Sequence, residues 1–148
     1  MNKLDSALLS ILIKDARASF ADIARQLNIS RAHARTRVQA LVDAGVIEQF
    51  SAVINPEKLG KVISTFVDLK VSPVAIEPIA QELANCPEVV SLYIMSDLQS
   101  LHIHTLTDST EGFDAFVREH IFNRPEIISV ECKTLLSRVK NRRGGARL

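Results

Sequence analysis

Apolar residues near the start of the chain recur at the spacing of buried helix faces, and this pattern predicts three short helices. The first follows Asp5, an expected N-cap, and contains the apolar run 8–13. The second covers 20–27 behind the expected cap Ser19, with a polar residue three positions further on as in a capping box. A tight turn over 28–30 leads to the third helix. Two short helices joined in this way indicate a helix-turn-helix.

The third helix has one apolar side and one side rich in hydrogen-bond donors. Its expected cap is Ser30 and its expected end is Gly45. The apolar stripe follows i, i+4, i+7 and i+8, on Ala34, Val38, Leu41 and Val42. Donors on the other side can bind base edges and phosphates in a major groove. We expect the DNA contacts to come from Ser30, Arg31, His33, Arg35, Thr36, Arg37 and Gln39. The β-branched segment 46–54 then predicts a two-stranded wing.

The second half of the chain contains β-branched and helical segments in the order βαββαβ. Strands are expected over 62–71, 89–95, 101–106 and 127–139, and helices over 73–84 and 109–122. This order indicates a ferredoxin-like domain. The expected fold class is therefore α+β, with an N-terminal winged helix-turn-helix followed by a ferredoxin-like βαββαβ domain. Its helices cover one sheet face, and apolar side chains on the other face predict self-association.

Charge is distributed unevenly, although the net charge is only +1. Residues 1–60 carry eight Lys and Arg against six Asp and Glu, residues 61–132 four against eleven, and residues 133–148 six against none. The acidic middle segment is not expected to face phosphates. We expect a DNA-binding domain over 1–55, a linker over 56–60, an oligomerisation and effector-binding domain over 61–140, and a basic tail over 141–148. The tail either adds nonspecific phosphate contacts or is a solvated terminus.

Composition excludes several classes of protein. With 47% hydrophobic and 24% charged residues, the chain is typical of soluble globular proteins. Its apolar runs fall short of the roughly 18–20 residues that cross a membrane, and the N-terminus lacks the cleavage site of a signal peptide. Its two cysteines, Cys86 and Cys132, have no disulfide or metal spacing. We expect a cytoplasmic protein without a membrane partner.

Catalytic motifs are not evident in the sequence. It contains no glycine-rich phosphate loop, no GxSxG and no HExxH, so we expect neither an enzyme nor a cofactor. His102 and His104 share one face of a predicted strand and could hold a metal, with His120 as a third ligand if it folds close. A subunit contact or a half-buried sheet is the favoured interpretation of these histidines, and no metal site is expected.

The chain resembles the Lrp/AsnC family, the feast-famine regulators of bacteria and archaea, over nearly its whole length. Four stretches carry the resemblance: 4–9 (LDSALL), 23–30 (IARQLNIS), 41–47 (LVDAGVI) and 53–60 (VINPEKLG). The later stretches 113–117 and 125–127 fit the same layout. The resemblance implies a sequence-specific DNA-binding transcriptional regulator that binds double-stranded DNA. It also implies a C-terminal domain that binds small amino acids, and dimers that assemble into octamers or other higher forms.

The family's ligand lies at a subunit contact near the turn between the second and third strands, where the pattern is roughly G-x-[FY]-D-[FY]. The matching turn here is Ser96, Asp97, Leu98, Gln99 and Ser100. Serine replaces the glycine, so a side chain intrudes where the ligand would approach the backbone. Glutamine replaces the aspartate, which removes a partner for an ammonium group unless Asp97 substitutes. The turn therefore predicts a changed or absent effector, with a free amino acid as the best ligand class.

Two alternatives stay open at the level of the sequence. One is an architectural protein that wraps DNA without an amino-acid effector, against which the low arginine density outside residues 31–37 argues. The other is a metabolite-sensing oligomer whose N-terminal domain contacts protein rather than DNA. Loss of DNA binding on substitution of Arg35 and Arg37 separates the DNA-binding classes from the second alternative.

Overall fold

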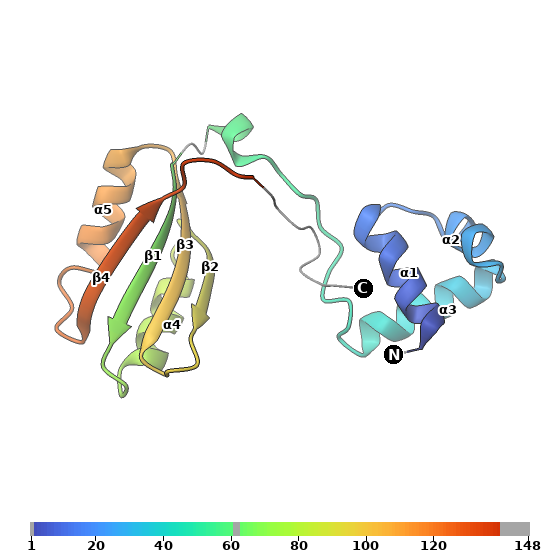
Figure 1. The fold of residues 1–148 in the computed structure, drawn as a ribbon, viewed down its shortest axis with the longest axis horizontal. Coiled ribbons are helices and arrows are strands. Elements are labelled where there is room, and N and C mark those ends of the chain that lie inside the picture. Colours follow the sequence, from blue (N-terminus) through green and yellow to red (C-terminus); the bar gives the residue numbers. More distant parts are fainter. Residues whose placement is uncertain (1, 61–62, 140–148) are drawn as a thin grey trace. The chain divides into compact units, whose positions relative to one another are not determined.

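The computed structural model describes residues 2–60 and 63–139, and these divide into two compact units. The first unit ends at Ile54, and the second runs from Asn55 to Val139 (Figure 1). The basic tail predicted over 141–148 lies outside the described residues. None of the helices in the described ranges is long and apolar enough to cross a membrane.

Three helices form the N-terminal unit: α1 (Lys3–Lys14), α2 (Phe20–Leu27) and α3 (Arg31–Asp43). Serine caps begin the last two, as predicted. Ser19 Oγ accepts a hydrogen bond from the Asp22 N–H, and Ser30 Oγ accepts one from the His33 N–H, each at 3.1 Å. Each cap satisfies a backbone donor that the first turn of a helix leaves without an intrahelical partner. The Ser19 hydroxyl also donates to the Asp22 carboxylate at 2.6 Å, so the two residues predicted to form the capping box are in contact.

The three helices close over one apolar core. Leu8 of α1, Ile23 of α2 and Ala34 of α3 are fully buried at its centre. The predicted stripe of α3 continues through Val38 and Leu41, which are also buried. Full burial of a side chain such as Leu8 stabilises the folded unit by roughly 1.5–3 kcal/mol relative to exposure. This core holds α2 and α3 against α1 as a helix-turn-helix.

Helix α1 begins earlier than predicted, because Asn2 is its N-cap. Asn2 Oδ1 accepts a hydrogen bond from the Asp5 N–H at 2.8 Å. The prediction that Asp5 caps this helix is therefore wrong. Asn and Asp cap about equally well, and the use of Asn2 leaves the buried Asp5 carboxylate for a partner outside α1.

Helix α3 ends at Asp43, and Gly45 stops it from the C′ position, as the sequence predicts. Gly45 has φ +68°, a left-handed conformation that costs a residue with a side chain about 1–2 kcal/mol. Its N–H donates to the Val42 carbonyl, and the Val46 N–H donates to the Leu41 carbonyl, both at 2.9 Å. This pair of bonds is a Schellman motif, which satisfies carbonyls at the end of the helix and turns the chain away from its axis.

The predicted two-stranded wing over 46–54 is not formed, and this prediction is wrong. In the structure these described residues have no strand, although their composition is β-branched and apolar. A hairpin needs a turn residue between its strands, and the segment contains no Gly, Asn, Asp or Pro. It therefore runs without regular structure, with Phe50, Val53 and Ile54 each more than half exposed.

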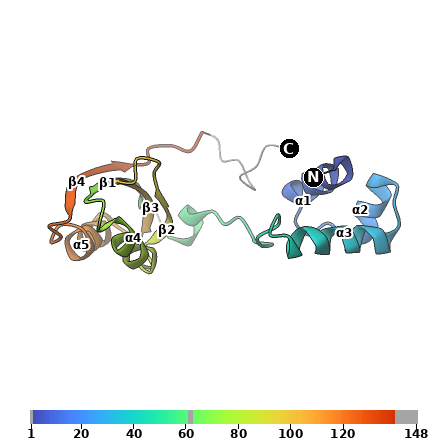
Figure 2. The ribbon, with the colours of Figure 1, turned by 90° about the horizontal axis from the view of Figure 1, so that it is seen from below.

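The second unit has the predicted βαββαβ order after a short 3₁₀ helix, η1 (Pro56–Leu59). Its elements are β1 (Ile63–Val71), α4 (Ile76–Ala84), β2 (Val89–Ile94), β3 (Ser100–Thr107), α5 (Thr110–His120) and β4 (Ile127–Thr134). The strands form one antiparallel sheet in the spatial order β2-β3-β1-β4. Helices α4 and α5 lie on the same face of this sheet (Figure 2). The ferredoxin-like prediction is confirmed.

Two boundaries in this unit differ from the prediction. Helix α4 begins at Ile76 instead of residue 73, because the preceding residues form a turn in which the Ala75 N–H donates to the Ser72 carbonyl at 2.9 Å. Strand β4 ends at Thr134 instead of residue 139. Thr134 lies opposite Thr65, two residues after the start of β1, so the ladder of backbone hydrogen bonds ends near the end of its partner strand.

The helix-covered face of the sheet carries the core of the second unit. Side chains at alternate positions of β1 and β3, including Val67, Leu69, Leu101 and Ile103, are almost fully buried there. They pack against apolar residues of both helices, such as Leu83 of α4 and Phe116 of α5. The alternation follows from the strand geometry, in which successive side chains point to opposite faces.

The opposite, open face of the sheet has an aromatic centre. Phe66 stacks on the imidazoles of His104 and His102, with ring centroids 4.5 Å and 5.6 Å apart. A hydrogen bond of 2.7 Å joins His104 Nε2 to Ser64 Oγ, and another of 2.7 Å joins His102 Nδ1 to Asp68 Oδ1. The face is thus partly aromatic and partly polar.

Substitution of Gly45 by Ala tests the end of α3. We expect a loss of roughly 1–2 kcal/mol in the free energy of unfolding, because alanine is strained at positive φ. The space around the position is open, so strain and not a clash is the cause. Gly45→Asn should lose less, since asparagine tolerates this conformation. The measurement is chemical denaturation followed by circular dichroism.

Gly112→Ala in α5 is the matched control. Gly112 has helical geometry, and an added Cβ meets Ser109 Oγ at an ordinary 3.4 Å. Alanine favours a helix over glycine by about 1 kcal/mol, so this variant should be as stable as the parent chain or more so. An equal loss of stability in both alanine variants would contradict the explanation that strain at the positive φ of Gly45 causes the loss.

Candidate nucleic-acid interface and effector turn

The exposed side of α3 holds three donors that have no partner among the described residues. The side chains of Arg31, His33 and Arg35 are exposed, and none makes a hydrogen bond or an ion pair with another described residue. Arg31 and Arg35 lie four residues apart, so they are neighbours on the helix surface. Both guanidinium groups can therefore form bidentate hydrogen bonds with an external acceptor such as guanine or phosphate.

Three other predicted contact residues on α3 have partners within the helix. Gln39 donates to the Asp43 carboxylate at 2.8 Å, and the Thr36 hydroxyl donates to the Ala32 carbonyl at 3.0 Å. Ser30 is the N-cap, at the end of the helix where free backbone N–H groups favour anions. All three side chains are exposed, so an external partner can compete for them.

Arg37 is placed differently from the other residues of the predicted set. Its side chain turns toward α1, where Nε and Nη2 donate to Asp5 Oδ1 at 3.0 Å and 2.7 Å. Nη2 also donates to Asp5 Oδ2 at 2.7 Å. This pair could not be predicted from the sequence, because the two residues lie 32 positions apart and nothing local in the sequence links them.

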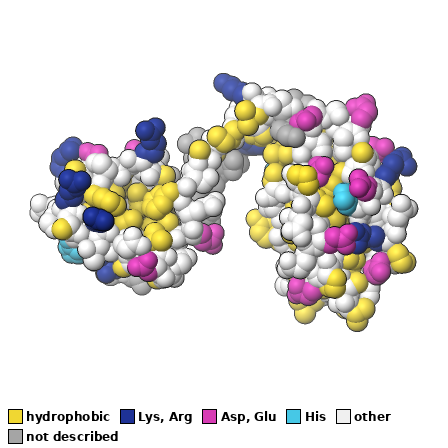
Figure 3. Space-filling view, turned by 180° about the vertical axis from the view of Figure 1, so that it is seen from behind, with side chains coloured by type: hydrophobic (Ala, Val, Ile, Leu, Met, Phe, Trp, Pro, Cys, Tyr) yellow, Lys and Arg dark blue, Asp and Glu magenta, His cyan; other side chains and the backbone are white. Residues whose placement is uncertain are grey.

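The two units differ in the charge of their surfaces. Figure 3 shows Lys and Arg side chains gathered at one end of the N-terminal unit, whereas acidic side chains predominate on the visible face of the second unit. Phosphate backbones attract the first distribution and repel the second. The charge therefore favours the helix-turn-helix unit as the nucleic-acid interface.

The turn between β2 and β3 is held by Asp97. Its Oδ1 accepts hydrogen bonds from the backbone N–H groups of Gln99 and Ser100 at 3.0 Å and 2.9 Å. Its Oδ2 accepts from Lys70 Nζ and from the Ser100 hydroxyl, both at 2.6 Å. The Lys70 ammonium, followed by the Ser100 hydroxyl, holds the pKa of Asp97 well below its ordinary value. The carboxylate is therefore ionised and occupied by groups of its own chain.

The other residues of this turn are exposed. Leu98 has φ +54°, and 65% of its surface is accessible to solvent. Ser96 and Gln99 are exposed as well, and their side chains make no hydrogen bond with any other described residue. Asp97 thus organises the turn, and Ser96 and Gln99 are exposed side chains there that can both donate and accept. The sequence did not reveal the role of Lys70, which reaches the turn from the end of β1.

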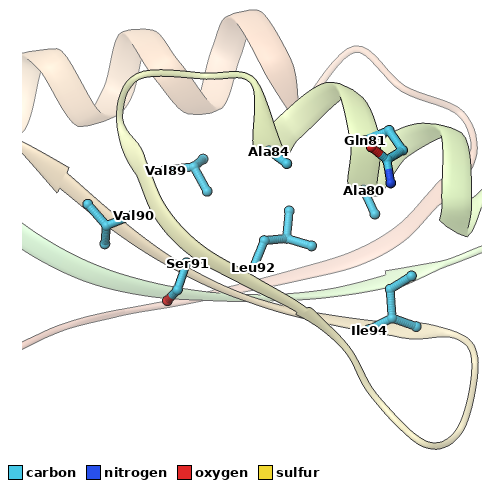
Figure 4. Close-up of a pocket in the computed structure, with 8 residues that line it drawn as sticks. All are labelled: Ala80, Gln81, Ala84, Val89, Val90, Ser91, Leu92 and Ile94. Atoms are coloured by element: carbon cyan, nitrogen blue, oxygen red, sulfur yellow. The ribbon is translucent and has the colours of Figure 1, made fainter. Parts of the chain in front are cut away.

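A groove on the second unit lies elsewhere, between α4 and the edge strand β2 (Figure 4). Its volume is about 390 Å³. Small and apolar side chains line most of it, namely Ala80, Ala84, Val89, Val90, Leu92 and Ile94, with Gln81 and Ser91 as the polar ones. It contains no charged side chain and none of the turn residues, so it offers no ionic partner to an amino acid.

The two histidines of β3 do not form a metal site with His120. They lie on the open face, whereas His120 packs against Phe116 of α5 on the other side of the sheet, with ring centroids 5.4 Å apart. Burial, followed by the nearby charges of Arg138 and His102, lowers the pKa of His104. Within the described part of the chain, no group of three or more His, Cys, Asp or Glu side chains is placed to bind a metal.

Relatives of this chain are transcriptional regulators. The HTH-type transcriptional regulator Ptr1 of Methanocaldococcus jannaschii is 33% identical over 137 residues, which cover 92% of this chain and 90% of the relative. Among solved structures, AsnC of E. coli superimposes with a TM-score of 0.86 at 24% identity, covering 96% of both chains. A regulator from Neisseria meningitidis, solved as a complex with L-Met, gives a TM-score of 0.87 at 19% identity, covering 96% of this chain and 94% of that one.

Two family models match this chain, one over the N-terminal unit and one over the second unit. The winged helix-turn-helix DNA-binding model matches residues 1–48, which contain α1, α2 and α3. The Lrp/AsnC ligand binding domain model matches residues 64–144, more than half of the chain. The resemblance seen in the sequence is confirmed, and the chain belongs to the Lrp/AsnC family of DNA-binding transcriptional regulators.

Proposed function

We propose that this regulator binds DNA by placing α3 in the major groove, with Arg31 and Arg35 as its principal contacts. The observation that carries the proposal is the pair of exposed guanidinium groups, four residues apart and without a partner among the described residues. An arginine that already lacks a protein partner loses no ion pair when it binds a base or a phosphate. Bidentate bonds to guanine are the commonest specific contact of arginine in the major groove.

The other exposed polar residues of this surface supplement the two arginines. Ser30 and the free N–H groups at the start of α3 are suited to phosphate. His33, Thr36 and Gln39 are placed to add contacts to the backbone or to bases, Gln39 by exchanging Asp43 for an external partner. These contacts orient the helix, and the arginines supply most of the discrimination between bases.

We further propose that two or more copies associate through the open face of the sheet. Phe66 and the exposed Tyr93 are aromatic side chains on this face, and they border the His102 and His104 imidazoles. Sheet-to-sheet packing covers them. A dimer presents two copies of α3 to successive half-sites, and an octamer or another higher assembly extends this arrangement. The proposed location is the cytoplasm, where the DNA of bacteria and archaea lies.

The proposed effector is a free amino acid bound near the β2–β3 turn. The match to a ligand binding domain and the L-Met complex of a similar fold support this ligand class. Asp97 is occupied by Lys70 and by the turn itself, so it is not available to an ammonium group. We therefore assign ligand contact to Gln99, whose amide can accept from an ammonium group and donate to a carboxylate.

Alanine substitution of Arg31 and of Arg35 tests the DNA interface. The fragments tested are genomic and include the promoter of the regulator's own gene. Each variant should bind the best of these fragments at least roughly tenfold more weakly than the parent chain, as expected for the loss of one bidentate base contact. A variant that loses a phosphate contact should also lose about one unit of the salt slope. The measurement is a DNA-retention titration at several salt concentrations.

The matched control removes an arginine from the second unit. Arg118 is exposed on α5, where it pairs with Asp114, so Arg118→Ala changes the net charge equally without touching α3. Its affinity for DNA should stay that of the parent chain. Equal effects of all three substitutions would contradict the interface. Failure of the parent chain to retain any fragment would contradict DNA binding itself and favour the protein-contacting alternative.

Addition of single amino acids to the same titration tests the effector. At least one should shift the affinity for DNA by about fivefold or more, the lower end of typical allosteric coupling. Gln99→Ala should abolish this shift and leave the affinity without amino acid unchanged. Gln81→Ala, a change of the same kind on α4, should keep the shift. Indifference of the parent chain to every amino acid would overturn the effector proposal and favour a regulator without one.

A further inference from the structure

We infer that Arg37 is a positioning residue of the recognition helix and not a DNA contact: bound to Asp5, it fixes α3 on α1 and so determines where Arg31 and Arg35 meet the DNA. The inference rests on the proposed role of α3 in DNA binding. The arginines of α3 thus have two different functions, contact with DNA and positioning of the helix. The acidic residue Asp5 also has a role in DNA recognition.

The Asp5–Arg37 pair has the geometry of a structural link. Three hydrogen bonds of 2.7–3.0 Å join the two side chains, and both carboxylate oxygens take part. The side chain of Asp5 is 6% exposed and that of Arg37 is 31% exposed. A planar guanidinium fork on a carboxylate fixes both distance and orientation, which a lysine at the same position does not. The pair therefore restricts rotation and sliding of α3 against α1.

Asp5 is itself held firmly within α1. Its backbone N–H is bonded to Asn2, the N-cap, so the residue lies in the first turn of the helix. Its carboxylate is close to the positive end of the α1 dipole, which favours a negative charge. The Arg37 guanidinium lowers the pKa of Asp5 below its ordinary value, so the pair stays ionised near neutral pH. The anchor for α3 is thus a fixed point of α1.

Arg37 also lies on a different flank of α3 from Arg35. At about 100° per residue, Arg37 and Arg35 are separated by about 160° around the helix axis when measured through the buried side at Ala34. The exposed residues Ala32, Thr36, Gln39 and Asp43 occupy the outer side between them. A groove that receives this outer side together with Arg35 leaves Arg37 on the flank next to α1.

A bidentate contact of Arg37 with phosphate or a base through Nε and Nη2 requires the loss of its bonds to Asp5, which use these same donors. The carboxylate would then remain as an unpaired charge with little access to water, which is strongly unfavourable. Arg31 and Arg35 meet no such cost, because neither is bound to a described residue. The most favourable arrangement keeps Arg37 on Asp5 and uses the two other arginines for DNA.

Two substitutions distinguish positioning from direct contact: Asp5→Asn and Arg37→Lys. The measurement is the affinity of the full chain for its best fragment and for unrelated DNA, at several salt concentrations. We expect both variants to lose about tenfold in the ratio of the two affinities, the equivalent of one mismatched base pair. The salt slope should stay unchanged, because no phosphate contact is lost. Circular dichroism checks that each variant is folded at the assay temperature.

Asp5→Asn is informative because it removes a negative charge from the DNA-binding unit. If charge were the only factor, or if the released Arg37 bound phosphate, this variant would bind DNA more tightly. Asp22→Asn is the matched control, with the same charge change in the same unit at an exposed ion pair with Arg25. It should keep the ratio of affinities of the parent chain.

Three results would overturn the inference. One is an Asp5→Asn variant that binds its best fragment as well as or better than the parent chain. Another is an Arg37→Lys variant that keeps the full ratio of affinities, which would show that a positive charge suffices. The third is a salt slope lower by about one unit in a folded Arg37→Met variant, the sign of a lost phosphate contact. A parent chain that does not discriminate between fragments would instead contradict the proposed function.

Discussion

The placement of the recognition helix depends on an ion pair between residues that lie far apart in the chain. Asp5 in the first turn of α1 and Arg37 in the middle of α3 are joined by three hydrogen bonds, beside a core that Leu8 and Ala34 fill. Apolar contacts hold the three helices together without specifying their orientation sharply, because they lack direction. The guanidinium fork supplies that direction. A DNA-binding surface needs such precision, since hydrogen bonds to base edges tolerate little displacement.

The second unit uses the same principle at its β2–β3 turn. Asp97 holds this turn in place through hydrogen bonds to Lys70 from β1 and to the backbone N–H groups of the turn. The turn is therefore ordered before any ligand arrives. The turn therefore loses less conformational entropy when an effector binds, but it offers that effector no free carboxylate. The two acidic residues thus act alike, each as the internal partner of a cation.

Most of the fold could be predicted because its signals are local. Ser19, Ser30 and Gly45 each determine a helix end within three or four residues of sequence, and the period-2 pattern of β1 and β3 determines which side chains enter the core. The prediction of a wing was wrong because β-branched composition indicates a strand but does not show that a partner strand is available to pair with it. The ion pairs of Asp5 and Asp97 could not be predicted, because their partners are brought together only by tertiary packing. For the same reason, the sequence does not show that Arg35 is exposed and unpaired among the described residues whereas Arg37 is bound to Asp5, although both occur in one donor-rich helix.

The segment from Val46 to Ile54 also limits the reach of the DNA-binding unit. Its nine residues have no regular secondary structure, and at about 3.3 Å per residue they span at most about 30 Å. Successive major grooves on one side of DNA are about 34 Å apart. In an assembly of several chains, binding of one unit therefore keeps the next at a high local concentration near the adjacent groove, on the order of millimolar for a short tether. In the proposed assembly, the length of this segment, more than its sequence, would then set which spacings between half-sites two units can reach together.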